Sequence, residues 1–209
     1  MHGTVPQKVG RLFANLLLHP HYIARCLTHN VIKGKTPLEL EIPWFSYAAI
    51  DFLEDFLQPQ MTVCEYGSGG STLFFAKRVK SVFSIEDNER WYELVSQRLQ
   101  RAGLNNATVV LCPFDFKKVD GFRHSAYLHA IPDSRFDVIV IDGSEEWNQV
   151  RPICFEKAQS RVKPGGIIVV DDSWRYPGLR LNHHAQSVRT FKSVGPGRPG
   201  VTSTDVFFY

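Results

Sequence analysis

The sequence predicts an α/β fold in which helices cover both faces of a mainly parallel sheet. Strand-like and helix-like runs alternate along the chain from about residue 61, and alternation of this kind implies right-handed crossovers between parallel strands. Two of the strand-like runs, 136–142 and 167–172, are almost entirely β-branched and apolar, as is typical of central strands buried on both faces. At 209 residues and 44% apolar composition, the chain can form one sizeable core.

The elements are expected in a regular order. A helix is predicted over 44–57, where apolar residues recur at helical spacing and Pro59 ends the run. Alternation and periodicity then predict strands at 61–65, 81–86, 107–112, 136–142 and 167–172, separated by helices at 71–79, 89–102 and about 148–161.

The end of the chain carries weaker signals. The Lys-Pro-Gly-Gly run at 163–166 predicts a turn before the fifth strand. Residues 187–194 and 203–209 are expected to form a closing strand pair, joined by the glycine- and proline-rich loop 195–200.

Charge separates the ends of the chain from its middle. Residues 1–38 contain five Lys or Arg and no acid, and residues 173–209 contain five against Asp205 alone. Such ends are compatible with contact to an anionic partner or membrane surface, and equally with solvated termini that balance an acidic middle. We expect residues 1–43 to form a helical, basic arm on a single domain that spans residues 44–209.

The arm also bears on location. Residues 8–27 have an amphipathic pattern, which suits either peripheral contact with a membrane or a helix packed on the domain. The apolar run 12–18 is too short to be a transmembrane segment and no cleavage pattern follows it, so we expect a cytoplasmic protein. The four cysteines lack metal-ligand spacing, which suits thiols in a reducing compartment. The arm and the aromatic segment 44–47 are compatible with a homodimer.

A glycine-rich turn follows the first predicted strand, in the sequence VCEYGSGGST (63–72). Ligands of open parallel sheets bind at the carboxyl ends of strands, and glycine lets the backbone approach them closely. The turn lacks both the Lys-Ser or Lys-Thr of a phosphate loop and the GxGxxG of a dinucleotide site. Instead, Glu65 precedes the glycines and Glu86 ends the second strand, where an acid can accept bonds from both ribose hydroxyls. The two acids predict a nucleoside ligand without a phosphate.

Four motifs occur along the chain in a fixed order: VCEYGSGGS (63–71), FSIEDN (83–88), FDVIVIDGS (136–144) and VKPGGIIVVDDSW (162–174). Together they resemble the motifs of class I S-adenosylmethionine-dependent methyltransferases, with Ser71 in the place of the usual third glycine. The resemblance spans about residues 44–209. It implies a three-layer Rossmann-like fold with a mainly parallel seven-stranded sheet, whose antiparallel last strand would be STDVFFY (203–209).

The resemblance also implies a cofactor site for S-adenosylmethionine. Glu65 and the backbone from Gly67 to Gly70 would hold the methionine part, and Glu86 would hold the ribose. Asp87 would lie near the adenine edge, and Asp115 is similar in placement to a residue that meets the adenine amine; for Asp115 a turn or helix-cap role is the alternative. The full set expected to bind the cofactor is Glu65, Gly67, Ser68, Gly69, Gly70, Ser71, Glu86, Asp87, Asp115 and Asp142.

Methyl transfer from a sulfonium depends largely on alignment, and it needs a base only if the acceptor must lose a proton. Acids at the ends of the fourth and fifth strands are the candidates, and we select Asp142, Asp171 and Glu145 as catalytic residues. The acceptor is expected to be a small molecule that is methylated on oxygen. An anionic acceptor would suit the arginines after the fifth strand, namely Arg175, Arg180 and Arg189.

The same acids are similar to the metal ligands of catechol and caffeoyl-coenzyme A O-methyltransferases. By this resemblance Asp142, Asp171 and Asp172 would hold Mg²⁺ or another divalent cation, because hard ions favour carboxylates. The pattern departs from that family in two places, since Asp172 stands where an amide is expected and Glu145 where a lysine is expected. The alternative is that these acids position the acceptor or take its proton.

Two other functions are alternatives to methyl transfer. A non-catalytic protein that binds S-adenosylmethionine is compatible with the departures just described. An NAD-dependent oxidoreductase would require the missing GxGxxG turn. The chain contains no asparagine-proline-proline-aromatic motif of nucleic-acid methyltransferases, so no nucleic acid is expected as a partner.

Overall fold

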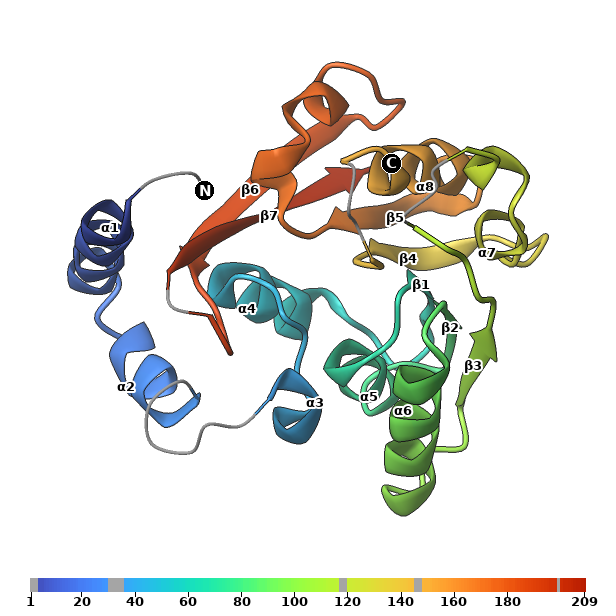
Figure 1. Ribbon diagram of the computed structural model, residues 1–209, viewed down its shortest axis with the longest axis horizontal. Coiled ribbons are helices and arrows are strands. Elements are labelled where there is room, and N and C mark those ends of the chain that lie inside the picture. The colour runs from blue at the N-terminus through green and yellow to red at the C-terminus, as the bar shows by residue number, and fades with distance from the viewer. Residues whose placement is uncertain (1–3, 30–35, 117–119, 145–147, 199) are drawn as a thin grey trace.

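The computed structural model describes residues 4–29, 36–116, 120–144, 148–198 and 200–209. Within these residues, seven strands form one mixed sheet at the centre of the molecule (Figure 1). Their order is β3-β2-β1-β4-β5-β7-β6, and β7 runs antiparallel to both of its neighbours while the other pairs are parallel. The strands are β1 (Thr62–Tyr66), β2 (Ser81–Glu86), β3 (Ala107–Leu111), β4 (Phe136–Ile141), β5 (Val162–Val170), β6 (Ser187–Val194) and β7 (Val201–Phe208). The predicted fold is therefore confirmed, including its antiparallel last strand.

Helices cover both faces of the sheet, as its sequence requires. On one face lie α4 (Tyr47–Phe56), α5 (Gly70–Ala76) and α6 (Glu89–Arg101), and on the other lie α7 (Ala126–His129) and α8 (Val150–Ala158). Alternate residues of β4 pack into the two resulting clusters: Val138 and Val140 into the first, and Ile139 and Ile141 into the second. This alternation explains why both sides of the strand must be apolar.

Local capping sets several helix starts. Helix α4 begins at Tyr47, three residues after the predicted start, because the Ser46 side chain accepts a hydrogen bond from the backbone N–H of Ala49 at 3.3 Å. The Asn88 side chain caps α6 in the same way by accepting from the N–H of Trp91 at 2.9 Å. Residues 163–166, which we expected to form a turn, belong to β5 instead.

The strand order creates a site at the centre of the sheet. After β1 the chain builds outward through β2 and β3, and it then returns to the other side of β1 as β4. The carboxyl ends of β1 and β4 consequently diverge into connections on opposite sides, which is the arrangement at which open α/β sheets bind ligands.

The N-terminal arm consists of α1 (Val5–Leu18), which packs beside β6 and β7 (Figure 1), and α2 (Tyr22–Leu27), whose Tyr22 contacts Tyr47 and Asp51 of α4. A short helix, α3 (Pro37–Leu40), follows before α4. In the ranges that the structure describes, no helix combines the length and the apolar character needed to cross a bilayer. All four cysteines are free, and Cys64 and Cys154 are buried.

Candidate active site

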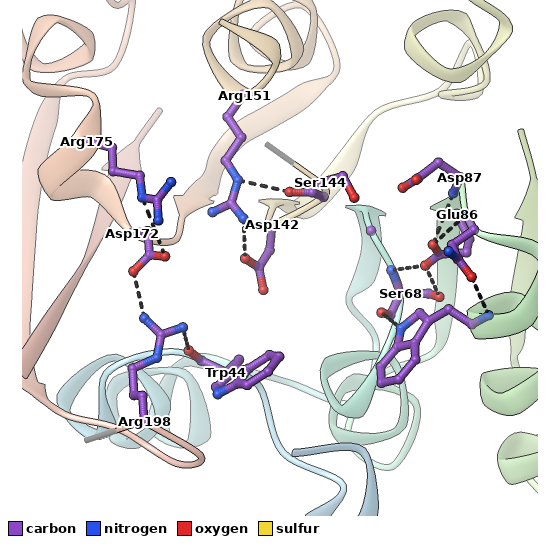
Figure 2. A pocket seen from close by; sticks show the side chains of 14 residues that line it. Trp44, Ser68, Glu86, Asp87, Asp142, Ser144, Arg151, Asp172, Arg175 and Arg198 are labelled. Atoms are coloured by element: carbon purple, nitrogen blue, oxygen red, sulfur yellow. Dashed lines mark hydrogen bonds and ion pairs between the residues drawn. The ribbon is translucent and has the colours of Figure 1, made fainter. Parts of the chain in front are cut away.

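A pocket of about 630 Å³ opens at the carboxyl ends of β1, β2, β4 and β5 (Figure 2). Two groups of side chains face each other across it. The first comes from the ends of β1 and β2 and from α6, and comprises Ser68, Glu86, Asp87 and Trp91. The second comprises Trp44, Asp142, Arg151, Asp172, Arg175 and Arg198. The volume is in the range of small-molecule sites, and we call the two groups the turn half and the arginine half.

The glycine turn brings the backbone after β1 against that after β4. Gly67 has a φ of +98°, and a Cβ at this position would lie 2.9 Å from the backbone nitrogen of Gly143. Only glycine combines this backbone conformation with this close approach. Gly67 and Ser68 therefore form part of the pocket wall.

The last glycine of the motif, Gly70, serves packing rather than the pocket wall. A Cβ on Gly70 would lie 2.3 Å from the carbonyl oxygens of Pro37 and Ile42, so α5 and the α3 segment touch through this glycine. Gly69, Gly70 and Ser71 do not border the pocket among its described lining residues. The glycine motif therefore has two separate physical causes, which are the close approach to the Gly143 backbone at Gly67 and the contact with the α3 segment at Gly70.

Glu65 is buried directly before this turn, with 1% of its surface exposed. Its Oε1 accepts hydrogen bonds from the hydroxyls of Thr72 at 2.8 Å and Ser84 at 2.6 Å, whereas Oε2 has no partner among the described residues. Burial raises the pKa of Glu65 to about 7, against the opposing effect of the hydroxyl groups around it. A buried carboxylate oxygen without a donor is suited to a cationic or N–H group supplied by a ligand.

Glu86 holds the turn half together. Its Oε2 accepts from the backbone N–H of Ser68 at 3.0 Å and from the Ser68 hydroxyl at 2.6 Å, and its Oε1 accepts from the N–H groups of Asp87 and Asn88. The Trp91 indole donates to the carbonyl oxygen of Ser68 at 2.6 Å. The Glu86 carboxylate, which the sequence implies as the ribose ligand, is therefore held in place. Of its four donors, the Ser68 hydroxyl can reorient, whereas the three backbone N–H groups cannot.

Asp87 also borders the pocket, where burial and the neighbouring charge of Glu86 raise its pKa to about 6. Asp115 does not border the pocket, so the structure does not bring it to the other predicted cofactor residues. Glu145 lies outside the described residues.

In the arginine half, aspartates pair with two arginines. Arg151 pairs with Asp142 at 3.1 Å and donates to the backbone oxygens of Gly143 and Asp171. Arg198 donates to Asp172 at 2.6 Å and to the Trp44 carbonyl oxygen at 2.9 Å. Figure 2 shows Asp142 and the Trp44 ring between this network and the turn half.

The three aspartates have different environments. Burial raises the pKa of Asp142 and of Asp171, although Arg151 and Arg198 oppose the increase. Burial acts in the same direction on Asp172, but Arg198 and the Thr202 hydroxyl outweigh it and lower the pKa of Asp172 to about 2. Asp142 is the member of the three that combines a raised pKa with a position in the pocket wall.

Comparison with known proteins decides the family. A family model described as a methyltransferase domain matches residues 64–173, which contain the glycine turn, Glu86, Asp142 and both strand-five aspartates. The chain belongs to this methyltransferase family. It is an enzyme that depends on S-adenosylmethionine, and the oxidoreductase alternative has no support.

Solved structures share the fold of this methyltransferase. A protein described as an O-methyltransferase from Klebsiella pneumoniae is 15% identical with a TM-score of 0.58, and the match covers 97% of this chain and 98% of that one. A protein described as a methyltransferase from Streptococcus mutans, in complex with SAH, is 13% identical with a TM-score of 0.58 over 84% of this chain and 99% of that one. Cofactor-bound Rv0187 from MTB is 20% identical with a TM-score of 0.55 over 100% and 98%. No curated protein sequence matches the chain.

The residues of the methyltransferase fit S-adenosylmethionine. Gly67 and Glu86 border the pocket, and Glu86 presents acceptors at the end of β2. Glu65 is not among the described residues that line the pocket, but it directly precedes the turn, and its unpartnered oxygen suits a cationic group. These residues would hold the methionine part and the ribose, as the motifs implied.

The aspartates after β4 and β5, in contrast, do not fit a metal ion. Among the residues that the structure describes, no group of three or more His, Cys, Asp or Glu side chains is arranged to hold a metal ion. Guanidinium groups of Arg151 and Arg198 pair with the three aspartates instead, and Asp171 is turned into the core, where it accepts from the Thr204 hydroxyl at 2.7 Å. The departures at positions 145 and 172 pointed in this direction. Asp171 does not border the pocket either, so its position does not suit the catalytic role that we expected.

Sequence reasoning missed the two arginines of this network. Arg151 lies in the first turn of α8, between the third and fourth motifs but in neither, and Arg198 lies in the loop between β6 and β7, beyond the last motif. The arginine inside a Gly-Pro-Gly-Arg-Pro-Gly loop was the one available signal. Of the arginines that we did select, Arg175 borders the pocket, whereas Arg180 pairs with Asp205 and Arg189 stacks on Phe191.

Proposed function

We propose that this enzyme transfers the methyl group of S-adenosylmethionine to an oxygen atom of a small, anionic acceptor. The observation that carries the proposal is the position of Asp142, which lies in the pocket wall on the side of the arginine half that faces the turn half (Figure 2). A group in this place can contact an acceptor that has entered from the arginine half while the cofactor occupies the turn half.

The cofactor supplies an activated methyl group on a positively charged sulfur. The protein contributes alignment: Glu65 and Gly67 fix one end of the cofactor site and Glu86 the other, so the reactants meet in one orientation. Buried carboxylates such as Glu65 also favour a cationic ligand over a neutral one. The positive charge of the ligand stabilises the ionised carboxylate, which is shielded from water.

Asp142 would take the proton of an acceptor hydroxyl. Burial raises the pKa of Asp142 toward neutrality, which strengthens it as a base, while Arg151 at 3.1 Å keeps the carboxylate in place. Arg151 is itself fixed by the backbone oxygens of Gly143 and Asp171, so the carboxylate has little freedom to turn away.

Arg175 supports an anionic acceptor. Its closest approach to Asp172 is 3.9 Å, which is too long for a hydrogen bond, and the guanidinium borders the pocket. Arg198, in contrast, already donates to Asp172, Thr202 and the Trp44 carbonyl oxygen. The Trp44 indole is 45% exposed and offers a flat apolar surface nearby. A planar hydroxy acid would match these groups, with its carboxylate at Arg175, its ring against Trp44 and its hydroxyl at Asp142.

The test uses labelled S-adenosylmethionine with a panel of hydroxybenzoates, their carboxamides and their O-methyl ethers. We expect label on the hydroxy acids, weak transfer to the carboxamides, and none to the ethers. Asp142→Asn should lower kcat by about 100-fold or more, a much larger effect than its change in cofactor affinity. Arg175→Gln should raise KM for the acids alone, with Arg189→Gln on the exposed face of β6 as the control.

Two results would overturn this assignment. Equal turnover of acids and carboxamides would remove the role of Arg175, and a fully active Asp142→Asn enzyme would remove the base. Transfer to nitrogen or carbon instead of oxygen would contradict the reaction type.

A further inference from the structure

The N-terminal arm presents large apolar side chains to solvent. In α1, Val9, Phe13 and Leu17 are spaced four residues apart and therefore share one face of the helix. Phe13 is 63% exposed, Leu17 is 79% exposed and the adjacent Leu18 is 76% exposed. Leu12 and Leu16 of the same helix already pack against the core, so the exposed stripe is a second apolar surface beyond the one that an amphipathic helix needs to pack on its domain.

Helix α2 extends the same surface. Ile23 and Leu27, again four residues apart, are exposed, and the two helices enclose a groove of about 260 Å³. The groove is lined by Phe13, Leu16, Leu17, Ile23, Cys26 and Leu27, all of them apolar. We call the exposed set of Val9, Phe13, Leu17, Leu18, Ile23 and Leu27 the arm face. A continuous apolar surface of this kind marks contact with a protein or a membrane.

Polar contacts fix the arm in this orientation. The Asn15 side chain accepts from the backbone N–H of Val194 at 3.0 Å, and Tyr22 donates to Asp51 at 2.9 Å. Arg25 also pairs with Asp51. The domain therefore holds the arm by these polar contacts and by the packing of Leu12, Leu16 and Tyr22 on the core, while the arm face stays exposed. The arm itself lies beside β6 and α4 in Figure 1.

Charge distinguishes between the partners that could cover the arm face. Residues 1–38 carry five Lys or Arg and no acid in the sequence. Arg25 is paired with Asp51, and the sequence of α1 itself contains two cations, Lys8 and Arg11, and no acid. A second copy of the chain would bring two such basic segments together, and like charges at an interface are unfavourable. An anionic lipid surface has the complementary charge and accepts apolar side chains between its headgroups.

We propose that the arm face binds the surface of anionic membranes, with the stripe from Val9 to Leu18 inserted among the lipid headgroups. The binding is peripheral and reversible, because two short helices bury much less apolar surface than a membrane-spanning segment. It is independent of the acceptor and of the chemistry in the pocket.

Co-sedimentation of the full chain with vesicles tests the proposal, using phosphatidylcholine alone and phosphatidylcholine mixed with phosphatidylserine. We expect binding to the mixed vesicles that decreases as salt is added, and weak binding to the neutral ones. Leu17→Ser with Leu18→Ser should weaken binding about tenfold, and Phe13→Ser alone should weaken it less. Leu181→Ser is the matched control, since Leu181 is 84% exposed but lies after β5, outside the arm.

Each variant needs an unchanged melting temperature, and S-adenosylmethionine affinity serves as an independent check of the fold. Absence of binding to mixed vesicles, or equal loss in Leu181→Ser, would overturn the proposal. Light scattering completes the test. A dimer in the wild type that becomes a monomer in Leu17→Ser/Leu18→Ser would assign the arm face to self-association instead.

Discussion

Glu86 connects the cofactor turn to the start of α6, because its two carboxylate oxygens accept from Ser68, Asp87 and Asn88. Glu86→Ala should weaken binding of S-adenosylmethionine by about 1 to 3 kcal/mol, through the lost ribose contacts and a less ordered turn. Calorimetric titration measures this change. Glu93→Ala, which removes an exposed acid from α6, should leave the affinity unchanged. An unaltered affinity in Glu86→Ala would remove Glu86 from the cofactor site.

Glu65 makes the stability of the cofactor-free protein depend on pH. Its pKa is raised from 4.5 to about 7, so between these values the unfolded chain releases a proton that the folded protein retains. The free energy of unfolding should therefore decrease as pH rises through this window, by about 3 kcal/mol for this group. Above pH 7 its contribution is constant.

Urea unfolding of the wild type and Glu65→Gln at pH 4.5 and pH 7.5 checks this expectation. Glutamine does not ionise, so the variant should lack this part of the decrease and be the more stable protein at pH 7.5, while it binds S-adenosylmethionine more weakly. Parallel pH profiles for the two proteins would contradict the assignment of the raised pKa to Glu65.

At the scale of elements, neighbouring glycines at the start of α5 should behave differently. A Cβ on Gly70 would lie 2.3 Å from two backbone oxygens of the α3 segment, which cannot move aside as a flexible side chain would. Gly70→Ala should therefore destabilise the protein by about 1 to 3 kcal/mol. At Gly69 the nearest atom to a new Cβ is 3.6 Å away, so Gly69→Ala should change stability by less than about 0.5 kcal/mol. Thermal unfolding of the two variants separates these cases, and equal effects would show that α3 yields.

On the scale of the whole molecule, Arg198 joins parts of the chain that lie far apart in sequence. It contacts Asp171 and Asp172 after β5 and the carbonyl oxygen of Trp44 before α4. Arg198→Ala would leave buried acids without their partner and should lower the free energy of unfolding by about 3 kcal/mol. Lys192→Ala, a cation on the exposed side of β6, should have almost no effect. Similar urea midpoints for both variants would contradict this role.

Separation along the sequence explains which site residues could be predicted from it and which could not. Glu86 and Gly67 could be predicted because a strand end and the turn after it are local features with characteristic residues, and both border the pocket. Arg198 was not found as a site residue, since its contact with Trp44 spans 154 positions and depends on how β6 and β7 return to the sheet. Gly70 was assigned to the cofactor because a sequence does not distinguish a glycine that faces a ligand from one that faces α3.

The loop between β6 and β7 has a consequence for divergence among related enzymes. It carries Arg198 into the arginine half, yet its own length is not constrained by the pairing of the two strands. The turn half is built from other segments, those around β1 and β2. Single substitutions here are restricted, because Arg198 holds two acids and a Cβ on Gly195 would lie 2.5 Å from the Phe45 carbonyl oxygen. We therefore expect a new acceptor to evolve through paired changes of Arg198 and Asp172, and a directed-evolution library that varies these two positions together should leave cofactor use intact.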